Sequence, residues 1–157
     1  KCVYSTAEAV EQYAFDADLV VGAVLIPGAA APKLLRREHL SRMKPGAVVV
    51  DVAIDQGGCF ETSKPTSHQD PTYVVDGVVH YCVSNMPGGV ARTSSMALVN
   101  ATMPFVLALA DKGPIKAMLD DEHLRNGLNV HKGEITYRAV ADALNRPYVE
   151  ALEALRL

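Results

Sequence analysis

The sequence from Gly46 to Gly58, GAVVVDVAIDQGG, decides the fold of this chain of 157 residues. Pro45 precedes the stretch, and its nearly continuous apolar run ends at Asp55-Gln56 and two glycines. Such a run predicts a strand that is buried on both faces of a parallel sheet. Open α/β sheets bind ligands just beyond the carboxyl ends of their strands. Asp55 is therefore the first candidate for a functional side chain.

A second strand and a crossover helix are predicted before this stretch. Residues 19–25 (LVVGAVL) are apolar and predict another buried strand, and residues 33–43 carry apolar side chains at roughly helical spacing. A connection of this length allows the two strands to pair in parallel. Nearer the start of the chain, Ser5 and Glu8 have the spacing of a capping box and predict a helix to about Tyr13.

A hairpin and then helices are predicted after the stretch. Residues 57–71 are polar and contain proline, which predicts a surface loop, and Asp76-Gly77 between apolar runs predicts a β-hairpin within residues 73–83. From residue 93 to Lys112 the pattern predicts a helix interrupted by Pro104, followed by amphipathic helices over 115–126 and 136–144. This change of character predicts a domain boundary at residues 91/92.

Composition and charge narrow the class of partner. With 49% hydrophobic and 21% charged residues, the chain has the composition of a soluble globular protein. A net charge of -3, without a basic cluster beyond Arg36-Arg37, argues against nucleic acid or an anionic membrane. We expect no transmembrane segment. The odd, widely spaced cysteines predict reduced thiols in a cytosolic protein, and the histidines lack metal-ligand spacing, so no metal is expected.

The glycine-rich turn that holds a dinucleotide pyrophosphate is not found in these residues. Two strands and a hairpin would form half a sheet with an open edge. We therefore expect the chain to be the carboxyl-terminal part of a longer polypeptide.

Four segments of the chain resemble the alanine dehydrogenases. They are residues 20–28 (VVGAVLIPG), 32–33 (PK), 43–61 (MKPGAVVVDVAIDQGGCFE) and 81–87 (YCVSNMP). The similar proton-translocating nicotinamide nucleotide transhydrogenases usually have Gln-Asn where this chain has Asp55-Gln56, so this dipeptide favours the dehydrogenases. The resemblance implies an α/β fold: residues 1–91 form the second half of a Rossmann-type doubly wound parallel sheet that binds NAD. Residues 92–157 would then be a linking helix and the carboxyl-terminal helices of a substrate domain.

The same resemblance implies reversible, NAD-dependent oxidative deamination of L-alanine to pyruvate and ammonia in a cytoplasmic homo-hexamer. The missing amino-terminal part of the polypeptide would supply the substrate-binding Arg and Lys, the catalytic His and the phosphate-binding glycines, so this chain alone would be inactive. The NAD-binding subunit of a transhydrogenase is the alternative. A nucleotide-sensing module, or another α/β enzyme such as a methyltransferase, would be a different class of protein.

The resemblance also assigns roles to residues. Asp55 would be catalytic, because its carboxylate could accept a hydrogen bond from the catalytic His or the substrate amine and stabilise an iminium-like charge. Lys64 stands where the family usually has Arg, and lysine lacks the fork that makes a bidentate contact. The implied cofactor contacts are Ser5, Val24, Leu25, Val52, Ala53, Ile54, Asp55, Lys64, Val83, Ser84, Asn85 and Met86.

Other polar residues near the strand ends have simpler explanations. Asp51 is as well explained by a structural role as by a functional one, and we leave it outside the catalytic set. Gly57-Gly58 is better explained by a turn than by close approach to a cofactor. Cys59 is expected to pack in the core, and the histidines to be solvated or buried without a partner carboxylate.

Overall fold

The computed structural model describes residues 1–24, 26–27 and 30–156, and the chain divides into two compact units. The first unit comprises Lys1–Ile26 and Ala30–Gly89, and the second contains the chain from Val90 onward. This division lies close to the expected boundary at residues 91/92.

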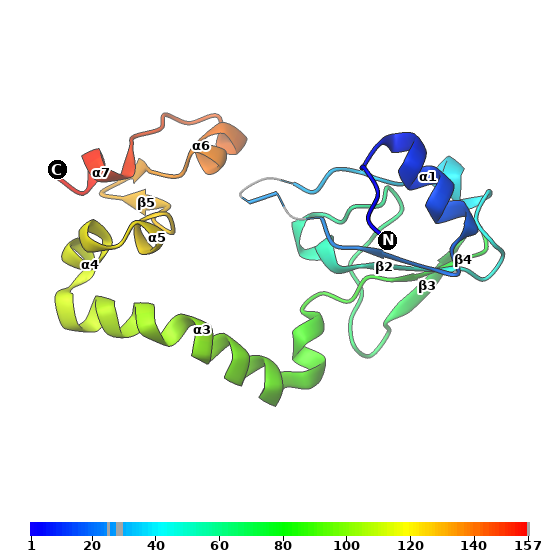
Figure 1. The fold of residues 1–157 in the computed structure, drawn as a ribbon, viewed down its shortest axis with the longest axis horizontal. Coiled ribbons are helices and arrows are strands. Elements are labelled where there is room, and N and C mark those ends of the chain that lie inside the picture. Colours follow the sequence, from blue (N-terminus) through cyan, green and yellow to red (C-terminus); the bar gives the residue numbers. More distant parts are fainter. Residues whose placement is uncertain (25, 28–29, 157) are drawn as a thin grey trace. The chain divides into compact units, whose positions relative to one another are not determined.

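A four-stranded sheet in the order β1-β2-β4-β3 forms the centre of the first unit (Figure 1). The strands β1 (Leu19–Gly22), β2 (Val48–Asp51) and β4 (Val78–Tyr81) are parallel, whereas β3 (Thr72–Val75) pairs antiparallel with β4. The expected α/β fold with a parallel β1–β2 pair is therefore confirmed.

The predicted hairpin between β3 and β4 is also confirmed. Its two turn residues, Asp76 and Gly77, have φ angles of 49° and 83°. Two consecutive positive φ angles are what a two-residue turn requires to match the twist of the strands, and Asp-Gly adopts them readily.

One face of the sheet is buried and the other is partly open. Val49 of β2 and Val78 of β4 pack with Ala14 of α1 (Ala7–Asp16) in a single core. On the opposite face, Leu19 and Val21 of β1 are 56% and 57% exposed. The prediction that these strands are buried on both faces is therefore wrong for this chain, because the core that includes α1 covers one face only.

The first helix begins one residue later than predicted. The hydroxyl of Thr6, not that of Ser5, accepts the capping hydrogen bond, from the backbone N–H of Ala9 at 3.1 Å. Ser5 is exposed and lies just before the cap. The Ser5 capping box is thus wrong, because the neighbouring threonine supplies the same acceptor.

Only a short part of the helix predicted over residues 33–43 forms. Only α2 (Arg37–Leu40) is helical, since Leu35 forms an isolated parallel bridge with Phe60, and the N–H of Leu34 donates to the carbonyl of Cys59 at 2.7 Å. Cys59 and Phe60 are themselves buried, with 0% and 2% exposure. The loop predicted to lie at the surface over 57–71 therefore passes through the core at residues 58–60.

The second unit is mostly helical. It contains α3 (Ala91–Lys112) with Pro104 inside it, α4 (Pro114–Asp120), α5 (Glu122–Arg125), α6 (Arg138–Leu144) and α7 (Ala151–Ala154). The helix predicted over 115–126 breaks at Asp121, whose carboxylate caps α5 by accepting from the N–H groups of His123 and Leu124. A short hairpin of β5 (Val130–His131) and β6 (Glu134–Ile135) was not predicted.

One helical stretch, Met86–Lys112, is long and apolar enough to cross a membrane by length and composition alone, with a mean hydropathy of 1.4. This differs from the expectation of no such segment, because polar residues and Pro104 interrupt the apolar side chains of this stretch. A single helix of this kind is a weak indication, since core helices of soluble proteins have the same composition.

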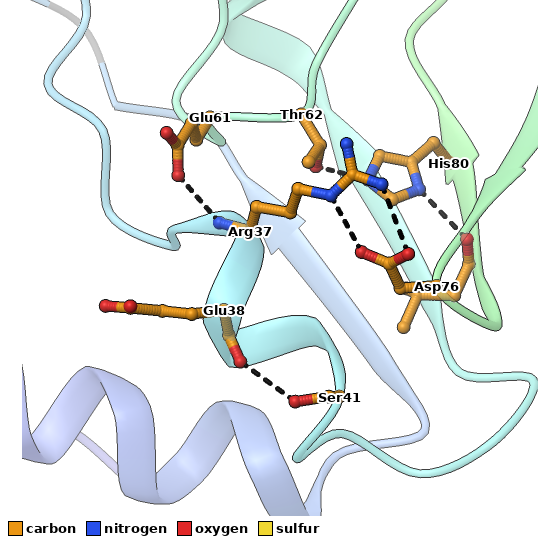
Figure 2. Close-up of polar contacts among 8 residues, drawn as sticks. Arg37, Glu38, Ser41, Glu61, Thr62, Asp76 and His80 are labelled. Atoms are coloured by element: carbon orange, nitrogen blue, oxygen red, sulfur yellow. Dashed lines mark hydrogen bonds and ion pairs between the residues drawn. The ribbon is translucent and has the colours of Figure 1, made fainter.

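A buried histidine, His80, lies in β4 of the hairpin. The Nδ1 atom of His80 lies 3.0 Å from the carbonyl oxygen of Val78, which can only accept, so in the neutral ring Nδ1 carries the proton. Nε2 then accepts from the hydroxyl of Thr62 at 2.7 Å, as Figure 2 shows. Burial, the largest cause, lowers the pKa of His80.

The depressed pKa of His80 predicts a loss of stability in acid. Between about pH 7 and pH 5 the unfolded chain takes up a proton at His80 that the folded chain resists, which costs about 1.4 kcal/mol for each unit of depression. Urea unfolding of the complete protein across this range should show that His80→Gln removes part of the acid slope. His123→Gln, at an exposed position, is the control and should keep the slope.

Candidate functional site

Three neighbouring parallel strands end at one edge of the sheet, and the candidate residues follow these ends. Val24 comes after β1, the short 3-10 helix η1 (Val52–Gln56) directly after β2, and Ser84-Asn85 after β4. The carboxylate Oδ2 of Asp55 accepts a hydrogen bond from the backbone N–H of Asn85 at 3.5 Å. The structure thus brings the loops after β2 and β4 together, at the edge where α/β sheets bind ligands.

The exposed groups at this edge differ in chemistry. Asp55 and Asn85 are exposed, and Val52 is 48% exposed, so a ligand at this edge could meet a carboxylate, an amide and an apolar surface. Ser84 and Met86 are half-buried beside them. Asn85 has a φ of 54°, which turns the chain sharply after β4.

Three of the proposed cofactor contacts have side chains that belong to the core. Ala53, Ile54 and Val83 are buried. Only their backbone atoms could therefore meet a ligand, and their role as contacts stays a prediction.

The other proposed contacts do not join Asp55 and Asn85. Ser5 lines a hollow of about 500 Å³ between α1 and β1, and Val24 packs against the core. Lys64 lies beside β3, with its Nζ 4.4 Å from the centre of the Tyr73 ring. Leu25 lies outside the described residues.

Asp51, the last residue of β2, forms hydrogen bonds that hold the segment after Gly58 against the end of the strand. Its carboxylate is fully buried and accepts from the N–H of Cys59 at 2.8 Å and from the hydroxyl of Ser63 at 2.5 Å. Gly58 makes this possible, because a Cβ there would lie 2.7 Å from the Oδ2 of Asp51. The structure therefore favours the structural explanation of Asp51, which the sequence had left open.

Cys59 is an inert packing residue, as the sequence predicted. Burial, with a contribution from the nearby Asp51 carboxylate, raises the pKa of the Cys59 thiol to about 12. The thiol therefore stays protonated at neutral pH.

Two histidines differ from expectation. Nε2 of His39 lies 3.6 Å from a carboxylate oxygen of Glu11 and 3.7 Å from one of Glu38, so the expectation of no partner carboxylate is wrong. His68, which sequence reasoning missed, places its Nε2 3.1 Å from the carbonyl of Asn85. No sequence motif marks that contact, because it joins two loops. Among the described residues, no group of three His, Cys, Asp or Glu side chains could hold a metal ion.

A polar hollow beside α2 contains charges that are already paired. Figure 2 shows the guanidinium of Arg37 against the carboxylate of Asp76, with hydrogen bonds of 3.0 and 3.2 Å. The backbone N–H of Arg37 donates to Glu61 at 2.7 Å, and the hydrogen bond and charge of Asp76 raise the pKa of Arg37. This ion pair joins α2 to the β3–β4 hairpin and is a structural feature.

The parallel strands, the crossover between them and the polar carboxyl edge define an α/β protein with a Rossmann-type nucleotide-binding sheet. The family model "Alanine dehydrogenase/PNT, C-terminal domain" matches residues 1–138. The chain belongs to this family.

Individual relatives agree with the family match. Alanine dehydrogenase of Halomonas elongata is 70% identical over 96% of this chain and 41% of its own length, and that of Mycolicibacterium smegmatis is 53% identical over 97% and 41%. A solved L-alanine dehydrogenase matches with a TM-score of 0.75 and 48% identity, over 90% of this chain and 39% of its own. The transhydrogenase from Sinorhizobium meliloti is more distant, with a TM-score of 0.64 and 27% identity over 86% and 36%. The chain thus spans about 41% of these curated relatives.

The buried contacts of Asp51 predict a large cost for its amide analogue. In Asp51→Asn the amide oxygen can replace Oδ2, but the charge that strengthens its hydrogen bonds is lost and the NH₂ group faces the Cys59 thiol in place of Oδ1. The free energy of unfolding should therefore fall by about 2 kcal/mol. Urea denaturation of the complete protein measures this. Asp18→Asn is the control, since Asp18 is exposed and, among the described residues, forms an ion pair only with Lys44. This substitution should change the free energy of unfolding by about 0.5 kcal/mol or less. A loss of similar size in both variants would contradict the role of Asp51.

Proposed function

We propose that the complete protein that carries this sequence catalyses the reversible, NAD-dependent oxidative deamination of L-alanine to pyruvate and ammonia. The observation that carries the proposal is the exposed Asp55 carboxylate at the carboxyl edge of the sheet, joined to Asn85 of the neighbouring loop. It is supported by relatives named alanine dehydrogenase that are up to 70% identical among those compared. Because this chain spans only part of those relatives, the activity is proposed for the complete protein.

The residues at this edge fit a nicotinamide nucleotide. Val52 offers exposed apolar surface for a ring, Met86 adds a half-buried apolar side chain from the segment after β4, and Ser84 and Asn85 offer polar groups for a ribose. When bound, NAD supplies the acceptor for the hydride that leaves the α-carbon of alanine. These contacts and the preference for NAD are proposals.

Asp55 would act on the substrate side of this reaction. As hydride leaves, positive charge develops on the alanine nitrogen, and a fixed carboxylate nearby stabilises that charge. The hydrogen bond from the Asn85 N–H holds Oδ2. Oδ1 makes no hydrogen bond to any other described residue and would accept from the substrate amine or from a catalytic histidine. Water then adds to the iminium carbon, and loss of ammonia gives pyruvate.

The proposed reaction also requires the rest of the polypeptide, and we propose that several copies of the complete protein assemble. We propose that the amino-terminal part supplies the phosphate-binding glycines, the substrate-binding Arg and Lys and the catalytic His, and that it covers the half-open apolar face of the sheet. The resemblance supports a homo-hexamer in the cytoplasm. Hydride transfer between two nucleotides, as in a transhydrogenase, is the alternative; the 27% identity to that relative and the Asp55-Gln56 dipeptide both disfavour it.

Addition of L-alanine and NAD to the complete protein tests the proposal, with the absorbance of reduced nicotinamide as the measurement. The wild-type protein should reduce NAD, and Asp55→Asn should lower kcat by about 10²-fold or more, because the amide cannot stabilise the developing charge. The Kd for NAD, measured separately by fluorescence titration, should change by less than about threefold, because the Asp55 carboxylate acts on charge that develops only in the transition state.

Asp18→Asn serves as the control and should keep both values. Unchanged turnover in Asp55→Asn would refute the catalytic role. Hydride transfer only to a second nucleotide would establish the alternative.

A further inference from the structure

Lys33, in the loop that follows β1, reaches across to the loop that follows β2. Its Nζ donates to the backbone carbonyl of Gly57 at 2.6 Å and to that of Gly58 at 2.7 Å. One ammonium therefore holds two consecutive carbonyl groups. Nζ carries three donors, so it can make both bonds at once.

The conformation of the glycines explains why one side chain reaches both oxygens. Gly57 and Gly58 have φ angles of 86° and 75°. Two consecutive left-handed residues curl the chain in one sense, so their carbonyl groups turn toward the same side. Residues with a Cβ disfavour this conformation, and at Gly58 a Cβ would also lie against Asp51.

The two carbonyls belong to the turn that ends η1. The N–H of Gly57 donates to the carbonyl of Ile54 and that of Gly58 to the carbonyl of Ala53, each at 3.0 Å, so both glycines are bonded directly to residues within η1. Asp55 lies within this same turn. A shift of the glycines would therefore shift Asp55 as well.

Backbone hydrogen bonds from the loop after β1 reach the residues on either side of the glycine pair. The N–H of Ala31 donates to Gln56 at 3.2 Å, and that of Leu34 donates to Cys59 at 2.7 Å. These two bonds lie on either side of the glycine pair, and the Lys33 side chain supplies the donor between them. With the two bonds from Lys33, the carbonyl groups of all four residues from Gln56 to Cys59 accept hydrogen bonds from the loop after β1.

We propose that Lys33 is a positioning residue of the dehydrogenase reaction. Its ammonium fixes the Gly57-Gly58 turn and thereby places the Asp55 carboxylate for charge stabilisation. The inference rests on the proposed function and adds a residue to it. Lys33 itself touches neither the cofactor nor the substrate in this mechanism.

Lys33→Met tests the proposal, because methionine keeps much of the side-chain length and loses the donors. We expect kcat in the complete enzyme to fall by about tenfold or more, with a change of less than about threefold in the Kd for NAD. Lys33→Arg, which retains several donors and the charge, should recover most of kcat. Lys44→Met is the matched control: the Lys44 Nζ pairs with Asp18 at 2.9 Å near the start of β2, and its loss should leave kcat unchanged.

A double substitution separates positioning from general weakening of the structure. In an Asp55→Asn background, Lys33→Met should lower kcat by less than about twofold, since the carboxylate that Lys33 places is already gone. A further fall as large as in the wild-type background would overturn the proposal. An unchanged kcat in Lys33→Met alone would overturn it as well.

Hydrogen exchange gives a readout that does not depend on activity. Amides of residues 54–58 should exchange faster in Lys33→Met than in Lys44→Met, because the turn loses the two hydrogen bonds from the Lys33 ammonium. Equal exchange in the two variants would overturn the positioning role even if the enzyme acts on another substrate. If the wild-type protein fails to reduce NAD with alanine but exchange is faster in Lys33→Met, the proposed function is refuted. The role of Lys33 in holding the Gly57-Gly58 turn is then still supported.

Discussion

The fully buried carboxylate of Asp51 is the interaction on which the carboxyl edge of the sheet depends. An acid at the end of a core strand is tolerated only if its oxygens find donors, and those donors come from the segment that follows the glycine pair: the N–H of Cys59 and the hydroxyl of Ser63. The chain must therefore leave β2, turn, and come back to β2 within a few residues. Gly58 supplies the space for this return.

The returning segment then fills the space beneath β1. Phe60 is buried against Gly22, where an added Cβ would collide with the Phe60 ring and the sulfur of Cys59. Leu35 and Phe60 pair as a short parallel bridge, and Thr66 pairs in the same way with Val83 beyond the end of β4. The loops at this edge thus continue the parallel pattern of the sheet. Such paired loops hold ligand-binding groups more firmly than free loops would.

Sequence patterns predicted what depends on local chemistry. The apolar runs gave β1 and β2, the Asp76-Gly77 pair gave the hairpin, and the rule of strand ends brought Asp55 and Asn85 to one edge. The sequence patterns failed where contacts between distant segments of the chain determine the local conformation. Leu34 and Leu35 have helical spacing with the residues that follow them, yet they pair with the segment after Gly58. An apolar run also cannot say what covers its second face, so the exposure of Leu19 was not foreseen. The hydrogen bonds from Lys33 depend on the left-handed conformations of Gly57 and Gly58, which the spacing of residues in the sequence does not predict.

The different environments of Asp51 and Asp55 follow from one change of backbone geometry. Side chains on a strand alternate between faces, so residues four apart point to the same side. If β2 had continued as extended chain, Asp55 would lie on the same buried face as Asp51. Instead the chain tightens into η1 directly after Asp51, and the tighter turn abolishes the alternation. Ala53 and Ile54 then turn into the core while Asp55 turns out to the edge beside Asn85. The same apolar sequence thereby places one carboxylate where it organises the fold and the other where a ligand can reach it.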